Sequence, residues 1–177
     1  MVTFHEASQE PQGELDEIEL VLVFAEPGDP HEQEVHTGLV SAYEYANNCF
    51  KHGKDQFHRN VRTILDLCWP NLDFDHQMRK TLLTDSVICS AKIECGGVST
   101  STSCECVKKY LLPQLALLPN ALVVALGGKS QKRLKMGGYS NFINAVAAAP
   151  PGCNFRSARA SWEQIAIEIK KRQCVGI

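Results

Sequence analysis

The sequence predicts an α/β fold of three layers, in which helices cover both faces of a central, mostly parallel, four-stranded sheet. Four apolar runs alternate along the chain with segments of helical periodicity, an order typical of parallel sheets. The run at 18–25 is almost continuously apolar, as expected for a strand buried on both faces. A length of 177 residues, with 44% hydrophobic and 21% charged residues, suits one globular domain.

The predicted elements follow in a regular order. Residues 1–17 are polar and acidic, and we expect a flexible arm before a single domain over 18–177. The predicted strands are 18–25, 82–89, 121–126 and 142–149. The predicted helices are 32–47, 57–68, 104–118, 129–136 and a last helix that Ser161 caps. Turn residues support these bounds, because Pro27 and Gly28 follow the first strand, Pro70 ends the second helix and Pro113 breaks or restarts the third.

Charge is distributed unevenly between the two parts of the chain. Residues 1–50 hold eleven Asp or Glu and no Lys or Arg, whereas residues 51–177 hold all eighteen Lys and Arg against nine acids. This asymmetry is compatible with a basic face that binds nucleic acid, although the net charge is only −2. The alternative is a solvated acidic arm with ordinary surface charge elsewhere.

Ligands of parallel sheets bind beyond the carboxyl ends of the strands, so the residues after each strand carry the functional information. Glu26 directly follows the first strand, where it either serves chemistry or caps the next helix. Gly128-Lys129-Ser130 is not a phosphate-binding P-loop, because Val123 stands where that motif needs glycine. What remains is a glycine turn that opens a basic helix, and this helix either contacts phosphate or is a solvated face.

Cysteines and targeting signals indicate a protein of a reducing compartment. Cys89, Cys95, Cys104 and Cys106 lie close together, but they lack the paired C-x2-C spacing of zinc sites. We therefore expect thiols and no cofactor, with zinc or an iron–sulfur cluster bound by these four cysteines as the alternative. No apolar run is long enough to cross a membrane, and no basic start of a signal peptide is seen. We expect a cytoplasmic monomer that has no membrane partner.

Three segments together resemble the uracil-DNA glycosylase superfamily, closest to its bacterial branches, over residues 18–172. The first is Val23-Phe24-Ala25-Glu26-Pro27-Gly28, which matches the catalytic motif after the first strand. The second is Thr84-Asp85-Ser86-Val87-Ile88-Cys89, which matches the strand that reads the base. The third and most specific runs from Glu105 to Gly127. Ala149-Pro150-Pro151-Gly152 stands where the family has the loop that penetrates the duplex.

The chain departs from the family pattern at several functional positions. No histidine follows His76, so the histidine that stabilises the leaving base is absent, and Ala149 stands near its place. Phe24 replaces the glycine of the first motif, and Asp85 replaces the asparagine that reads uracil. Cys89 and Cys106 match two of the ligands of the iron–sulfur branch, but no cysteine precedes Cys49 to supply the other two.

The resemblance implies a monofunctional DNA glycosylase that flips a pyrimidine out of DNA and hydrolyses its bond to the sugar, leaving an abasic site. Glu26 is then the expected catalytic carboxylate, which stabilises the cationic sugar and orients water. Asp85, Gly28 and Phe24 are expected to recognise the base. The expected DNA contacts are Lys129, Lys132, Arg133, Pro150, Pro151, Arg156 and Arg159.

The expected substrate follows from the hydrogen-bonding groups of Asp85. An ionised carboxylate only accepts hydrogen bonds, so it fits the exocyclic amine of cytosine and repels the O4 oxygen of uracil. A protonated Asp85 could also donate to cytosine N3, which would assist departure of the base without a histidine. Gly28 leaves room for a substituent at the 5-position, so a 5-substituted cytosine is the leading expectation, such as the glucosylated hydroxymethylcytosine of phage DNA removed in antiphage defence. Uracil excision in base-excision repair, a catalytically silent DNA-binding relative and a mononucleotide-binding domain are the alternatives.

Overall fold

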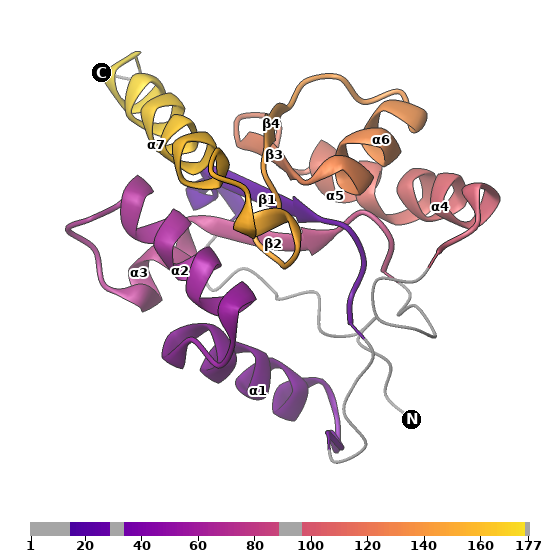
Figure 1. Cartoon of the computed structure of the whole chain (residues 1–177), viewed down its shortest axis with the longest axis horizontal. Coiled ribbons are helices and arrows are strands. Elements are labelled where there is room, and N and C mark those ends of the chain that lie inside the picture. The colour runs from indigo at the N-terminus through magenta and orange to yellow at the C-terminus, as the bar shows by residue number, and fades with distance from the viewer. Residues whose placement is uncertain (1–14, 29–33, 89–96, 176–177) are drawn as a thin grey trace.

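A computed structural model describes residues 15–28, 34–88 and 97–175, and its centre is a parallel sheet of four strands (Figure 1). The order across the sheet is β2-β1-β3-β4, with every neighbouring pair parallel. The strands are β1 (Leu20–Phe24), β2 (Thr81–Asp85), β3 (Leu122–Leu126) and β4 (Ile143–Ala145). The predicted three-layer α/β/α fold is confirmed, and each strand lies within or overlaps a predicted apolar run.

Alternate residues of β1 face opposite sides of the sheet, which explains why the strand is apolar along its whole length. Leu20 and Leu22 belong to the larger hydrophobic core, and Val21 and Val23 belong to the smaller one on the other face. All four side chains are fully buried. A central strand of this kind has no solvated face, so polar residues are excluded until the strand ends.

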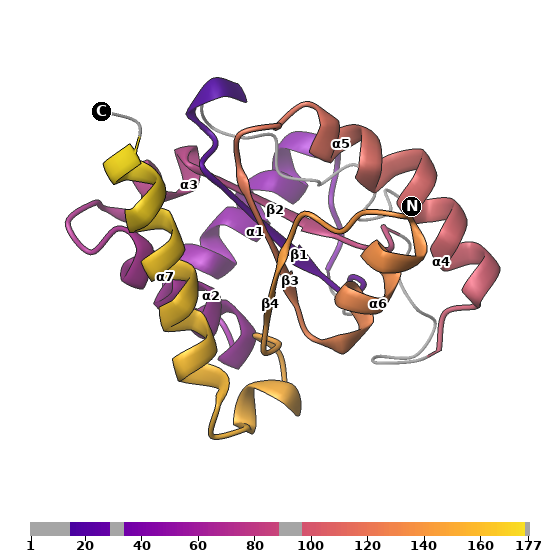
Figure 2. The same ribbon diagram turned by 90° about the horizontal axis from the view of Figure 1, so that it is seen from above.

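The larger core lies between the sheet and four helices on one face, α1, α2, α3 and α7 (Figures 1 and 2). Their bounds are α1 (Leu39–His52), α2 (Gln56–Cys68), α3 (Phe74–Arg79) and α7 (Ala158–Val175). Ile64 of α2 and Ile165 of α7 both belong to this core and are completely buried. Helix α2 begins at the N-cap Asp55, whose side chain accepts a hydrogen bond from the backbone N–H of His58.

The smaller core lies on the opposite face, beneath α4 (Thr100–Cys106), the π-helical turn η3 (Val107–Leu111), α5 (Leu112–Ala116) and α6 (Gly128–Met136). Figure 2 shows these helices on the side of the sheet away from α7 and α2. Leu111 and Leu115 pack inward at the centre of this layer. Because α6 starts directly after β3, its first turn lies at the carboxyl end of the sheet.

Several helix bounds differ from those that the sequence predicts. The helix predicted at 32–47 is α1, which begins at Leu39 and ends at His52, where Gly53 adopts a left-handed conformation that stops it. Helix α3 was not predicted, because it is short and its N-cap Asp73 follows an irregular turn. The predicted restart near Pro113 is confirmed, because α5 begins at Leu112 after the π-helical turn η3 and holds Pro113 in its first turn, where the missing N–H is tolerated.

Ser161 is not the N-cap of the last helix, because α7 already begins at Ala158. Its hydroxyl donates to the carbonyl of Ala158 at 2.8 Å and accepts from the N–H of Val146 at 3.0 Å. Ser161 therefore fastens the first turn of α7 to the chain that leaves β4. The predicted acidic arm falls mostly outside the described residues, and Leu15–Glu17 within it forms a 3-10 turn. Of the helices in the described segments, none has the length and apolar character of a transmembrane span.

Candidate functional site

Two carboxylates lie at the carboxyl ends of neighbouring strands. Asp85 is the last residue of β2, and its register partner on β1 is Phe24. Glu26 follows Phe24 by two residues, in the segment that leaves β1. Because β1 and β2 run parallel, both side chains emerge at the same edge of the sheet, where α/β proteins bind ligands. The sequence prediction that Glu26 and Asp85 share one site agrees with this placement.

Glu26 is held by two cations from one turn of α6. Lys129 donates to its Oε1 and Arg133 donates to its Oε2. The two residues are four positions apart on the helix and therefore lie on the same face. The Glu26 side chain is only 6% exposed, the Arg133 side chain 7% and the Lys129 side chain 45%. The carboxylate thus has an inner, buried partner and an outer, solvent-facing one.

The turn between β3 and α6 directs the start of this helix toward Glu26. Gly127 has a φ of 92°, in the left-handed region that favours glycine. A Cβ added there would come within 2.9 Å of the Cβ of Ala147, so a side chain is excluded on steric grounds as well. Gly127 lets the chain turn sharply past Ala147 and begin α6 at Gly128, which places Lys129 and Arg133 beside the end of β1.

Arg133 is a buried residue and does not face solvent, which corrects its predicted role as a phosphate contact. Its Nη1 donates to the carbonyl of Ala25 at 2.6 Å and to Oγ of Ser86 at 3.1 Å, in addition to Glu26. The Ser86 hydroxyl in turn donates to the same Ala25 carbonyl at 2.6 Å. This guanidinium joins the segments that leave β1 and β2, and its side chain is 7% exposed, so little of it faces the solvent from which DNA would approach.

Asp85 is partly buried beside this network. Burial, together with the negative charge of Glu26, raises the pKa of Asp85 to about 7, although the positive charge of Arg133 opposes the increase. Neutral and ionised Asp85 are therefore both populated near neutral pH. A carboxylic acid in this state can donate or accept a proton, whereas an ordinary surface aspartate is fully ionised.

The other predicted base-reading residues lie close to the same strand end. Phe24 is partly buried, and its ring meets that of Phe57 edge to face with centroids 5.1 Å apart. Its ring therefore packs on α2. Gly28 is exposed, and a Cβ added to it would meet no atom of the described residues within 4 Å. The predicted room for a 5-substituent at Gly28 stays a prediction.

The predicted DNA-contacting residues are divided between α6 and the loop before α7. Lys132, Arg156 and Arg159 are exposed, and Arg159 is paired with Glu163 at 3.1 Å on α7. Pro150 and Pro151 are exposed and joined by a cis peptide bond.

Helix α2 holds the proline-containing loop from behind. Asn60 of α2 donates to the carbonyl of Ala148 at 2.7 Å, and Gln56 donates to Asn154 at 3.0 Å. The loop therefore projects from a firm base beside the strand ends.

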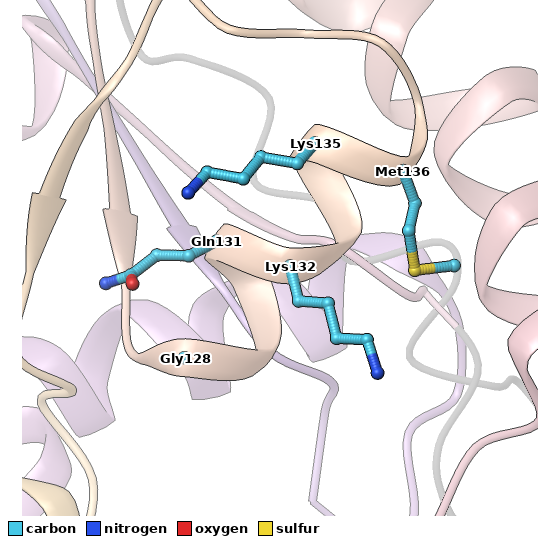
Figure 3. Close-up of a pocket in the computed structure, with 5 residues that line it drawn as sticks. All are labelled: Gly128, Gln131, Lys132, Lys135 and Met136. Atoms are coloured by element: carbon cyan, nitrogen blue, oxygen red, sulfur yellow. The ribbon is translucent and has the colours of Figure 1, made fainter.

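Two hollows flank α6. The larger, of about 510 Å³, lies on the outer face of the helix and is lined by Gly128, Gln131, Lys132, Lys135 and Met136 (Figure 3). The lysine side chains extend from the helix in different directions in this view. The second, of about 360 Å³, lies beyond β3 and β4, with Phe155 and Asn144 among its lining residues. Neither hollow is lined by Glu26 or Asp85.

The structure provides no metal site within residues 15–28, 34–88 and 97–175, where no group of three His, Cys, Asp or Glu is arranged to bind an ion. Cys104 is partly buried and Cys106 is buried in α4. Cys89 and Cys95 lie outside the described residues, so the four-cysteine alternative stays a prediction.

Ser86 and the inner role of Arg133 were missed by sequence reasoning. Ser86 directly follows Asp85 and is buried, with its backbone N–H donating to the carbonyl of Phe24 at 2.9 Å. The burial of Arg133 had no signal in the sequence, since Lys129, Lys132 and Lys135 on the same helix are exposed. Lys129 and Arg133 are four residues apart, a spacing that puts both on one face of a helix and allows them a common partner.

Comparisons with known proteins give no match: neither a protein-family model nor a curated protein matches the chain. Function is therefore inferred from the residues of the site and their geometry.

Proposed function

We propose that this protein is a monofunctional DNA glycosylase that removes a flipped-out modified pyrimidine, with a 5-substituted cytosine as its leading substrate. The observation that carries the proposal is the pair of carboxylates, Glu26 and Asp85, at the ends of adjacent strands. Glu26 is paired with two cations, whereas the pKa of Asp85 is raised to about 7. Two acids in such unequal environments form the acid and base pair that hydrolysis of a glycosidic bond needs.

Asp85 supplies the proton for the leaving base. In the reaction, the bond between C1′ of the sugar and N1 of the pyrimidine breaks, and its electron pair leaves with the base. Neutral Asp85 donates a proton to the base, which lowers the charge that develops on it. The absent histidine of the resembling family makes this role available, because no histidine follows His76 in the chain.

Glu26 supplies the negative charge next to the sugar. A carboxylate there stabilises the cationic transition state and orients the water whose oxygen bonds to C1′. The proton that this water loses passes to Glu26 and then to solvent, while Asp85 regains its proton from solvent. The products are the free base and an abasic sugar, so one water molecule is consumed in each cycle.

The substrate class rests on donors and acceptors. Cytosine offers an exocyclic amine that Asp85 can accept from in either protonation state, whereas uracil offers an oxygen there. The open space at Gly28 supports a base that carries a bulky group at the 5-position. Glucosylated hydroxymethylcytosine of phage DNA is a base of this class, and its removal would act as antiphage defence.

A catalytically silent DNA-binding relative is the second candidate, and one observation favours it. Both oxygens of Glu26 are engaged by Lys129 and Arg133, and neither hollow around α6 includes the two carboxylates. A protein in which these ion pairs persist with DNA bound would present a basic surface without chemistry.

The test is base release from matched single-stranded and duplex oligonucleotides that contain uracil, cytosine, 5-hydroxymethylcytosine or its glucosylated form. We expect release of a cytosine derivative, an abasic product and no strand cleavage before alkali. Efficient release of uracil alone would support repair of uracil instead. DNA binding without release of any base would support the silent relative.

A further inference from the structure

Arg133 carries a charge in a buried environment, where the loss of its hydration is unfavourable. A buried guanidinium gives up its hydration, and its ion pair regains this only when the geometry is good. Arg133 and Glu26 are each almost inaccessible at their side chains. An apolar pair of similar volume would pack equally well at this position, so packing alone does not require these charges.

The contacts of Arg133 connect three separate segments at one edge of the sheet. The guanidinium extends from α6 and forms an ion pair with Glu26, to whose carboxylate it donates. It also donates to the carbonyl of Ala25, at the end of β1. It also donates to Oγ of Ser86, the residue after Asp85. These contacts fix the backbone on both sides of the two carboxylates.

We propose that Arg133 is a positioning residue of the glycosylase site, which holds the Glu26 carboxylate in register with Asp85. The inference rests on the proposed function. Arg133 touches neither DNA nor base in this role, and it acts through Glu26 and the ends of β1 and β2. A catalytic carboxylate displaced by about 1 Å can lose about 100-fold in rate, so a residue that only positions it has a large effect.

Lys129 differs from Arg133 although both touch the same carboxylate. Its side chain is 45% exposed and reaches Glu26 from the solvent side. Lys129 is therefore open to competition from a DNA phosphate, whereas Arg133 keeps its contacts whether DNA is bound or not. The inner pair orients Glu26 permanently, and the outer one neutralises it until substrate arrives.

Electrostatics gives Arg133 a second effect, on Asp85. Among the described residues, the charges that act on Asp85 are Glu26, which raises its pKa, and Arg133, which lowers it. Lys129 acts on Glu26 from the outside. Loss of the Arg133 charge therefore moves the pKa of Asp85 upward from about 7, and this readout needs no turnover.

The experiment compares Arg133→Gln and Arg133→Lys with the wild type, and uses Arg79→Gln as a matched control. Arg79 is exposed at the end of α3, just before the amino-terminal end of β2, whereas Asp85 lies at the carboxyl end of that strand. Single-turnover rates, DNA affinity and the pKa of Asp85 from carboxyl ¹³C titration are measured for each variant. We expect Arg133→Gln to lose about 100-fold in rate with DNA affinity unchanged, and the pKa of Asp85 to rise. Arg133→Lys should recover part of the rate and keep the pKa near the wild-type value.

A wild-type rate for Arg133→Gln, an equal loss of rate and DNA affinity, or an unchanged Asp85 pKa would overturn the inference. Where Arg133→Gln does not fold, Glu26→Gln is compared with the double variant Glu26→Gln/Arg133→Gln. The added change should cost less than about threefold in rate, because Arg133 acts through Glu26. A further large loss overturns the positioning role.

Failure of the proposed function gives a different result from failure of the positioning role of Arg133. If the wild type releases no base from any oligonucleotide, the glycosylase proposal fails. The Asp85 titration still tests the structural part of the inference in that case, since Arg133→Gln must raise the pKa of Asp85 in the free protein and Arg79→Gln must not.

Discussion

Glu26 carries the largest expected effect of any single substitution on activity. Glu26→Gln keeps the shape of the side chain and removes its charge, so the rate of base release should fall by at least about 100-fold. DNA affinity should not decrease, because the carboxylate is buried and repels phosphate. Glu44→Gln, the same change on the exposed surface of α1, is the control. Near-wild-type activity of Glu26→Gln would remove this residue from the mechanism.

Asp85 should determine which base is released. Asp85→Asn replaces an acceptor, or an acid, with an amide that fits uracil, and a mismatched buried polar pair costs about 1–3 kcal/mol. We expect the ratio of cytosine-derivative release to uracil release to fall by about 10- to 150-fold. Asp75→Asn, an exposed position on α3, should leave the ratio unchanged. The ratio is measured on the oligonucleotide panel described above.

The raised pKa of Asp85 also makes stability depend on pH. An acid whose pKa is higher in the folded state than in the unfolded state binds its proton more tightly when folded, so stability falls as pH rises between the two values. With a folded pKa of about 7 and an ordinary aspartate pKa of 3.8, this loss occurs between about pH 4 and pH 7.

Asp85→Asn has no proton to lose, so this variant should gain stability relative to the wild type across the same range, on the order of 4 kcal/mol at most. Urea unfolding at pH 4, 5.5 and 8 measures this gain. An equal difference between the two proteins at all three values would contradict the raised pKa.

At the scale of elements, α6 combines a buried and an exposed function in little more than two turns. Lys132 is exposed on the outer hollow, so it is available to phosphate. Neutralising it with Lys132→Met should weaken binding to all DNA sequences alike and reduce the slope of log affinity against log salt by about 1. Lys171→Met, on an exposed part of α7, is the control. An unchanged slope for Lys132→Met would exclude α6 from the DNA-binding surface.

The elements that the sequence predicted best are those whose pattern depends on local chemistry. Strands β1, β2 and β3 follow from apolar runs, and α2 follows from its apolar stripe and its end near Pro70. The start of α1 was misplaced because residues 32–38 have helical spacing, although the chain becomes helical only at Leu39. Helix α3 was missed because six residues give too short a pattern to detect.

At the scale of the whole molecule, the site could be predicted only in part. Glu26 and Asp85 were expected to share a site because both fall in motifs of the family that the chain resembles, Glu26 directly after the first predicted strand and Asp85 within the second. The burial of Arg133 could not be foreseen, because it depends on how far α6 lies from the end of β1 after the turn at Gly127. A lysine and an arginine look equivalent in a basic helix, and tertiary structure alone separates the inner partner from the outer one.

Sheet order predicts where the backbone is best protected. Strand β1 lies between β2 and β3, and its residues Leu20, Val21, Leu22 and Val23 are fully buried. Amide hydrogen exchange should therefore be slowest in β1, and faster in the edge strand β4, which has a single neighbour. Exchange measured by NMR on the intact protein tests this order. Equal rates in β1 and β4 would contradict it.

The central position of β1 also determines when the protein can fold during its synthesis. Strand β1 leaves the ribosome before β2 and β3, and its second neighbour, β3, ends only at Leu126. Until then, one edge of an entirely apolar strand has no partner, which exposes the nascent chain to aggregation. Pairing across so long a stretch of sequence is slow. Synthesis that pauses before β3 therefore leaves the chain dependent on chaperones, whereas a pause after α6 leaves β1 paired on both edges.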